Sequence, residues 1–297
     1  MRIATAPVNW NNNDAPDYRE WTPYPQLIDE MVKAGYSVTE WGMNMPKEPT
    51  HLVADLQDRG LTMLGGFVGL ELRNPDNQKP EIERGIEAGR FFKAIGGEYL
   101  IAADSGSPRR LQEAGHVDPA GGLSRAEWNA LTAGLNELGR RLAPEKVKVV
   151  FHNHVGTFVE TEDETARLLD GTDPEFVGWC LDCGHLTYGG GDTLRLLEKY
   201  GDRVGYLHLK DVDGNVLEKS RTEGWSFQKA LKNFIFAPLG EGIAQVPEVL
   251  QALQDRSYRG WVVIEQDTTP LDPTQNAAEN RQYLEGLLTQ MQRFKVA

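Results

Sequence analysis

The stretch Trp179-Cys180-Leu181-Asp182-Cys183-Gly184-His185 is an apolar strand-like run that ends in a carboxylate, a turn and an imidazole. A strand with ionisable groups only at its C-terminal end is typical of α/β proteins, whose chemistry is located at the strand ends. Three other predicted strands end similarly: Phe151-His152-Asn153-His154, Leu207-His208-Leu209-Lys210-Asp211 and Val263-Ile264-Glu265-Gln266-Asp267. If these four ends meet, they form a metal site.

Strands and helices alternate along the whole sequence. The predicted strands cover residues 2–10, 36–41, 61–68, 98–103, 147–154, 176–181, 204–210 and 261–266. The predicted helices cover about 24–34, 50–60, 81–95, 124–142, 161–171, 193–200, 246–253 and 276–294, with capping boxes at Ser124-x-x-Glu127 and Thr161-x-x-Glu164. Eight such units predict the α/β class and one single-domain (β/α)8 TIM barrel over residues 1–297. A doubly wound dinucleotide fold is disfavoured, because no Gly-rich phosphate turn follows the first strand.

Composition narrows the classes of partner. The formal charge of −13 argues against a broad nucleic-acid or anionic-membrane surface, and no apolar run is long enough to cross a bilayer. Two cysteines provide no disulfide framework, and the N-terminus lacks the layout of a signal peptide. We expect a cytoplasmic protein that binds a small molecule and neither nucleic acid nor membrane. The sequence leaves the oligomeric state open, a homo-oligomer included.

Side-chain alternation decides which of the strand-end groups share a face. Residues two apart lie on the same face of a strand, as in the pairs His152 with His154, His208 with Lys210, and Glu265 with Asp267. Two imidazoles and two carboxylates from four consecutive strands suit a borderline divalent ion such as Mn, Co, Zn or Fe. One histidine at a strand end is more often structural, but burying four such ends without a metal would be costly.

Other conspicuous residues have competing interpretations. Cys180-x-x-Cys183 places one cysteine within a strand, unlike a redox pair at a helix N-terminus, so packing is the favoured role. Trp10 and Trp41 could wall a sugar-like ligand or pack in the barrel. Glu40 could bind a substrate hydroxyl or cap a helix. The charged residues of the long connection 212–242 are interpreted as a solvated surface.

The pattern Asp182-x-x-His185, followed by His208 and Glu265, resembles the xylose-isomerase-like barrels. Within that superfamily, six segments resemble the inosose dehydratases of inositol catabolism: Ala6–Trp10, Ala34–Gly42, His208–Val212, Gly224–Phe227, Phe236–Gly242 and Gly260–Asp267. Two positions depart from the expected pattern. His152 stands where epimerase-type members have a glutamate, and Leu239-Gly240-Glu241-Gly242 replaces an expected Pro-Gly-Asp-Gly.

The resemblance implies roles for individual residues. Asp182, His208, Glu265 and His152 are the expected ligands of a divalent Mn, Co or Zn ion, with Mg also allowed and His154 the rival of His152. Lys210, His185 and His154 are the expected acid/base groups, with the assignment of acid and base left open. Trp10, Glu40, Trp41 and Asp211 are the expected substrate contacts.

The resemblance also implies a reaction. We expect a metal-dependent lyase that removes water from a cyclic polyhydroxy ketone, an inosose, through an enediolate. The alternative is a sugar isomerase or epimerase on the same site, which shares the enediolate but keeps the hydroxyl. A DNA-repair endonuclease is disfavoured by the net charge, and a non-catalytic sugar-binding barrel would show neither bound metal nor activity.

Overall fold

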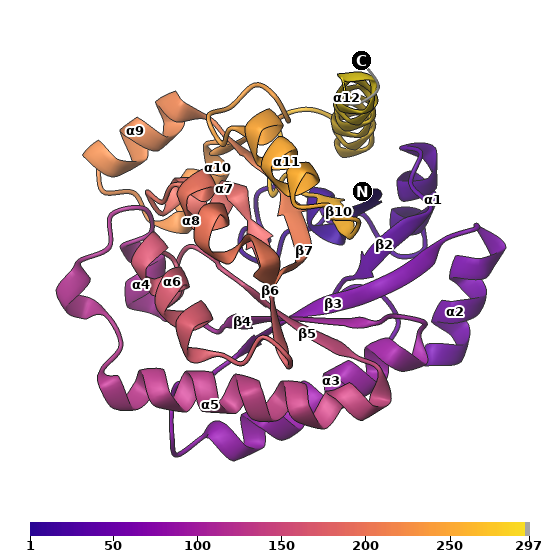
Figure 1. Ribbon diagram of the computed structural model, residues 1–297. Helices are drawn as coiled ribbons and strands as arrows, with labels where there is room; N and C mark the ends of the chain where they lie inside the picture. Colours follow the sequence, from indigo (N-terminus) through magenta and orange to yellow (C-terminus); the bar gives the residue numbers. More distant parts are fainter. Residues whose placement is uncertain (295–297) are drawn as a thin grey trace.

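The computed structural model describes residues 1–294 and shows eight parallel strands closed into one barrel, in the order β1-β10-β7-β6-β5-β4-β3-β2 (Figure 1). The strands are β1 Arg2–Thr5, β2 Val38–Trp41, β3 Thr62–Leu70, β4 Tyr99–Asp104, β5 Lys148–His152, β6 Val177–Asp182, β7 Val204–Leu209 and β10 Trp261–Ile264. The predicted (β/α)8 barrel is therefore confirmed. Successive strands of the barrel pair directly, and β7 pairs with β10 although β8 and β9 lie between them in the sequence.

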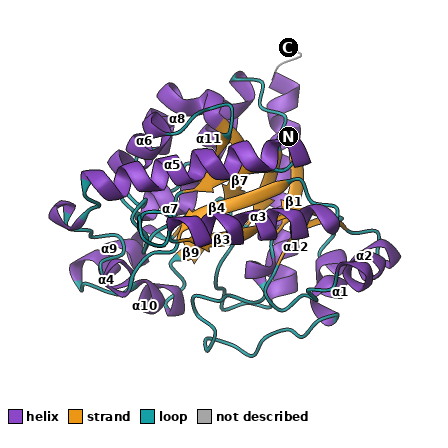
Figure 2. Ribbon diagram, turned by 90° about the horizontal axis from the view of Figure 1, so that it is seen from below, coloured by secondary structure: helices purple, strands orange, loops and turns teal. Residues whose placement is uncertain are grey.

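Helices surround the barrel on its outside (Figure 2). They are α1 Gln26–Lys33, α2 Pro49–Asp58, α3 Gln78–Ala94, α5 Arg125–Leu142, α6 Glu162–Gly171, α8 Thr193–Tyr200, α11 Val246–Asp255 and α12 Pro273–Phe294. Both predicted capping boxes are present, at the first turns of α5 and α6. Within residues 1–294, none of the helices is long and apolar enough to span a bilayer.

Two apolar layers hold this arrangement together. The larger one lies between the strands and the helices, and a smaller one fills the barrel with residues such as Ile101, Val150 and Val263. Strands buried on both faces explain the nearly continuous apolar runs in the sequence. Because the interior is filled by side chains, only the ends of the strands can offer groups to a ligand.

Several connections differ from the sequence prediction. β1 ends at Thr5, and the segment Pro7–Asn9 forms a 3₁₀ turn instead of continuing the strand. The connection 212–242 contains two helices, α9 Gly214–Thr222 and α10 Phe227–Lys232, capped by Asp213 and Ser226. Two short antiparallel strands, β8 Asp211–Val212 and β9 Phe236–Ala237, close it. The short helices α4 Pro108–Gln112 and α7 Cys183–Tyr188 were also missed, since segments of five or six residues show too little periodicity.

Candidate metal and catalytic site

A cavity of about 690 Å³ opens at the C-terminal ends of the strands. Its wall includes Glu40 from β2, Phe67 from β3, His152 from β5 and His208 from β7. Lys210, which follows β7, also contributes. The cavity therefore lies where parallel barrels position their chemistry.

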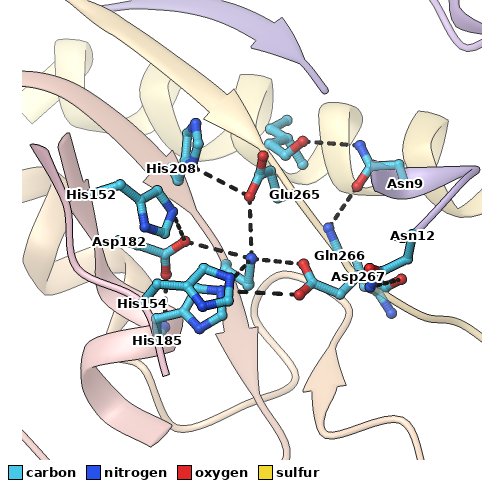
Figure 3. Close-up of polar contacts among 12 residues, drawn as sticks. Asn9, Asn12, His152, His154, Asp182, His185, His208, Glu265, Gln266 and Asp267 are labelled. Carbon is cyan, nitrogen blue, oxygen red and sulfur yellow. Dashed lines mark hydrogen bonds and ion pairs between the residues drawn. The ribbon is translucent and has the colours of Figure 1, made fainter. Parts of the chain in front are cut away.

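Four buried residues gather on one side of this cavity (Figure 3). His152 ends β5, Asp182 ends β6, His208 lies in β7 and Glu265 follows β10. Each offers one ligand atom, and these atoms all lie within 4.8 Å of one another. The strand register accounts for part of this geometry, since Asp182 lies directly opposite His208. His152 and His154 are the two candidates for the fourth ligand. His152, the last residue of β5, is the one that belongs to this group.

Several nitrogen and oxygen atoms of these four side chains have no hydrogen-bond partner in the protein. Among the described residues, His152 Nδ1, Asp182 Oδ2 and His208 Nδ1 are buried without a hydrogen-bond partner. Leaving a buried polar group unpaired costs about 1–3 kcal/mol. Two imidazoles and two carboxylates suit a borderline divalent cation. These residues therefore fit a metal ion.

Local structure holds Asp182 in place. Its Oδ1 accepts a hydrogen bond from the backbone N–H of His185 at 2.7 Å, so Asp182 is the N-cap of α7. Asn153, the residue after β5, makes two hydrogen bonds to the backbone of Asp182. Its side chain donates to the Asp182 carbonyl at 3.0 Å and accepts from the Asp182 N–H at 3.2 Å. The spacing Asp-x-x-His, interpreted from the sequence as a turn, is thus a helix cap that directs Oδ2 toward the other three residues.

Charges around the four residues determine their protonation. Burial opposes ionisation of Asp182, but Lys210 and His152 outweigh it and hold the pKa of this carboxyl well below its usual range. Burial lowers the pKa of His152. Burial also disfavours protonated His208, but the Glu265 and Glu40 carboxylates raise its pKa to about 9. The Asp182 carboxylate is therefore ionised, as metal binding requires, whereas a divalent ion would have to displace the proton that His208 carries at neutral pH.

Lys210 lies beside the four residues, in the middle of the site. Its Nζ is 2.6 Å from Asp267 Oδ1, 3.1 Å from Glu265 Oε2 and 3.0 Å from His185 Nε2. Burial opposes the charge, yet the carboxylates of Asp267, Asp182 and Glu265 raise the lysine pKa well above its usual value. Lys210 is thus an ammonium group at neutral pH, held on the cavity wall.

His154 and His185 form a stacked pair next to Lys210, with ring centroids 3.9 Å apart. The backbone of Val155 contacts both rings: His154 Nδ1 lies 2.6 Å from the Val155 carbonyl oxygen, and the Val155 N–H donates to His185 Nδ1 at 3.3 Å. A carbonyl oxygen only accepts, so His154 carries its hydrogen on Nδ1. Burial lowers the pKa of His154 to about 4, which leaves Nε2 as an unprotonated base. That nitrogen is 3.9 Å from Asp14 Oδ2.

Two of the expected substrate contacts do not line the cavity. Trp10 is fully buried in the outer core, where its indole N–H donates to Thr274 at 3.2 Å. A 3₁₀ turn at Pro7–Asn9 follows β1 and places Trp10 in the outer core, although Val8 and Asn11 on either side of it line the cavity. Asp211 accepts backbone N–H groups of Val212, Gly240, Gly242 and Ala244 and so ties a loop together. Both predictions of substrate contact are corrected accordingly.

The other residues of the predicted set do border the cavity. Glu40 and Trp41 line it, as do His154, His185 and Lys210. Asp14 and Phe67 were not predicted from the sequence and Asp267 was given no role, although all three line the same cavity. The alternation of side chains along a strand could have identified Asp267, since it shares a face with Glu265. It could not have identified Asp14, because Asp14 lies in an irregular loop.

Comparison with known proteins shows a match over nearly the whole chain. The family model described as xylose isomerase-like TIM barrel matches residues 28–287. A protein named inosose dehydratase from Geobacillus kaustophilus (strain HTA426) is 32% identical over 295 residues, covering 97% of this chain and 95% of the relative. The protein of the same name from Lacticaseibacillus casei is 31% identical over 291 residues, covering 97% of each.

Solved structures with low identity share the fold. L-ribulose 3-epimerase superposes with a TM-score of 0.74 at 14% identity, over 99% of this chain and 97% of that one. The IOLI protein, solved with a binding zinc atom, gives a TM-score of 0.73 at 15% identity, over 98% and 99% of the two chains. At such identities the likeness concerns the barrel alone.

Proposed function

We propose a function from the premise that this chain belongs to the xylose isomerase-like TIM barrel family, as the match over residues 28–287 shows. The chain is a dehydratase of the inosose class that acts with a bound divalent metal. The buried His–Asp–His–Glu group with unpaired donor atoms is the observation that carries the metal dependence. The full-length relatives named inosose dehydratase support the substrate class.

The metal would be held by His152, Asp182, His208 and Glu265. When bound, a divalent ion supplies positive charge that polarises a carbonyl oxygen. Mn, Co and Zn fit the mixture of nitrogen and oxygen donors, and Mg fits it less well because of the two imidazoles.

Dehydration of an inosose requires a base and an acid. The hydrogen on the carbon next to the ketone leaves as a proton, and an enediolate remains. The hydroxyl on the following carbon then leaves with a second proton as water, which gives an unsaturated ketone that tautomerises to a dione. His154, with its free Nε2 facing the cavity, is the proposed base. Lys210 is the proposed acid for the departing hydroxyl.

His185 is proposed to hold Lys210 in place, since its Nε2 lies 3.0 Å from the Lys210 Nζ. Exchange with solvent removes the proton gained by His154 and restores the proton lost by Lys210. After one turnover the protein is unchanged, and one water has left the substrate. We further propose a cytoplasmic location, with which the two free, buried cysteines accord.

Product analysis tests the proposal. Metal-depleted protein would be supplied separately with Mn²⁺, Co²⁺, Zn²⁺ and Mg²⁺ and incubated with scyllo-inosose while the absorbance of the dione is followed. We expect dione formation that depends on the metal. Isomerised or epimerised sugar without dione would indicate the alternative enzyme class. Absence of both metal binding and ketose turnover would indicate a sugar-binding barrel.

A further inference from the structure

We propose that Glu40 is a positioning residue of the metal site, acting through His208, and not a substrate contact. The inference rests on the proposed metal site. Glu40 belongs to β2, whereas the four candidate ligands come from β5, β6, β7 and the end of β10. It therefore reaches the metal site from another part of the barrel wall.

Within the described residues, the hydrogen bonds of the Glu40 carboxylate involve two residues of β7. Its Oε1 lies 2.8 Å from His208 Nε2 and accepts the hydroxyl hydrogen of Tyr206 at 2.9 Å. The Glu40 side chain is 4% exposed and that of His208 is 2% exposed. A short, buried contact between carboxylate and imidazole is held firmly, because water cannot compete for it.

This contact selects one tautomer of His208. A carboxylate oxygen accepts, so the hydrogen shared with Glu40 is carried on Nε2. A neutral imidazole then has its lone pair on Nδ1. That atom is the buried nitrogen without a hydrogen-bond partner, 3.4 Å from Glu265 Oε2. Glu40 thus turns the required nitrogen of His208 toward the other candidate ligands.

Tyr206 fixes Glu40 in turn. It lies two residues before His208 on the same strand, is fully buried, and packs against Tyr99 with ring centroids 4.8 Å apart. Its hydroxyl occupies the same carboxylate oxygen as His208 does. Tyr206 thus holds Glu40, and Glu40 would orient the candidate ligand His208. Hydrogen-bond partners of metal ligands typically contribute about 10–100-fold to metal affinity.

Metal affinity without substrate separates this role from substrate binding. Co²⁺ would be titrated calorimetrically into metal-depleted wild type, Glu40→Ala, Glu40→Gln and Tyr206→Phe. We expect affinity to fall by about 10–100-fold in Glu40→Ala. A smaller loss is expected in Glu40→Gln, whose amide oxygen still accepts from Nε2, and in Tyr206→Phe. Glu87→Gln is the matched control, since Glu87 borders the cavity and is exposed, and its affinity should be unchanged.

Two results would overturn the inference in different ways. Unchanged Co²⁺ affinity in both Glu40 variants, together with a raised KM for inosose, would make Glu40 a substrate contact and leave the proposed function intact. Absence of Co²⁺ binding by wild type would overturn the metal site and this inference together. If Glu40→Ala does not fold, nitrogen NMR of Zn²⁺-loaded wild type decides: the hydrogen of His208 should be on Nε2, and finding it on Nδ1 refutes the proposal.

Discussion

The two sides of the cavity are built from different residues. The side formed by β5, β6, β7 and β10 carries histidines, carboxylates and a lysine. The opposite side carries Trp41, Phe67, Phe91 and Phe92, and Trp41 contacts Phe91 with ring centroids 5.5 Å apart. The first side supplies charge and protons, whereas the second supplies an aromatic wall, with Arg84 and Glu87 of α3 beside it. We therefore expect substitutions on the charged side to change the rate of reaction, whereas those on the aromatic side should change substrate affinity.

Two strand-end aspartates test this division most strongly. Asp182 ends β6 in the metal site, whereas Asp104 ends β4 and pairs with Arg73 at 2.6 Å. We expect Asp182→Asn to abolish tight metal binding and to lower kcat/KM by about 10⁴-fold, because charge stabilisation at the ketone is lost. Asp104→Asn should lower thermal stability but leave Co²⁺ affinity unchanged. Full activity of Asp182→Asn would refute the site.

His154 tests the separation between metal binding and proton transfer. His154→Gln should lower kcat by about 10²–10⁴-fold, the usual contribution of a general base, while Co²⁺ affinity stays within a factor of two. The exposed His51 provides a control, and His51→Gln should behave as wild type. Steady-state kinetics and exchange of the substrate α-hydrogen in D₂O measure the effect. Retained exchange in His154→Gln would mean that another group is the base.

Glu160 joins the loops that follow the neighbouring strands β4 and β5. Its carboxylate accepts the backbone N–H of Gly115, in the loop after β4, and that of Gly156, in the loop after β5. Burial raises the pKa of this carboxyl from 4.5 to about 7. The folded chain therefore binds this proton more tightly than the unfolded chain. The resulting stabilisation is complete below pH 4.5 and is lost as the pH rises to about 7.

The expected change in the free energy of unfolding follows from that shift. It amounts to at most about 3 kcal/mol between pH 4.5 and 7, and Glu160→Gln should remove it. Urea unfolding at pH 5 and pH 8 measures the difference. The exposed Glu175 is the control, and Glu175→Gln should keep the wild-type pH dependence. A wild-type-like dependence in Glu160→Gln would show that other groups cause it.

Phe67 should give the smallest effect. Its side chain is 42% exposed on the cavity rim, with its ring 5.8 Å from that of His152. Phe67→Ala should raise KM by about 3–10-fold, the value of one aromatic contact, with little change in kcat. Leu271→Ala removes a comparably exposed apolar side chain outside the cavity and should have no effect. A fall in kcat without a rise in KM would contradict the division between the two sides.

The candidate metal group shows how much of a site can be predicted from sequence. Asp182, His208 and Glu265 were recognisable because each ends or follows an apolar strand, and parallel strand ends meet in any closed barrel. Trp10 was misplaced because the sequence did not reveal that β1 stops at Thr5. Asp211 was misassigned because three of its four backbone partners lie on a loop 29 to 33 residues away.

The sequence by itself determined the eightfold alternation, the closed barrel and the kinds of residue at the strand ends, because these depend on local periodicity. Only the tertiary structure decided that His152 and not His154 joins the four-residue group, and that Asp182 caps a helix while it faces that group. It also decided that Glu40 contacts His208, 168 residues away. Such contacts depend on distances across the barrel, which local sequence patterns do not encode.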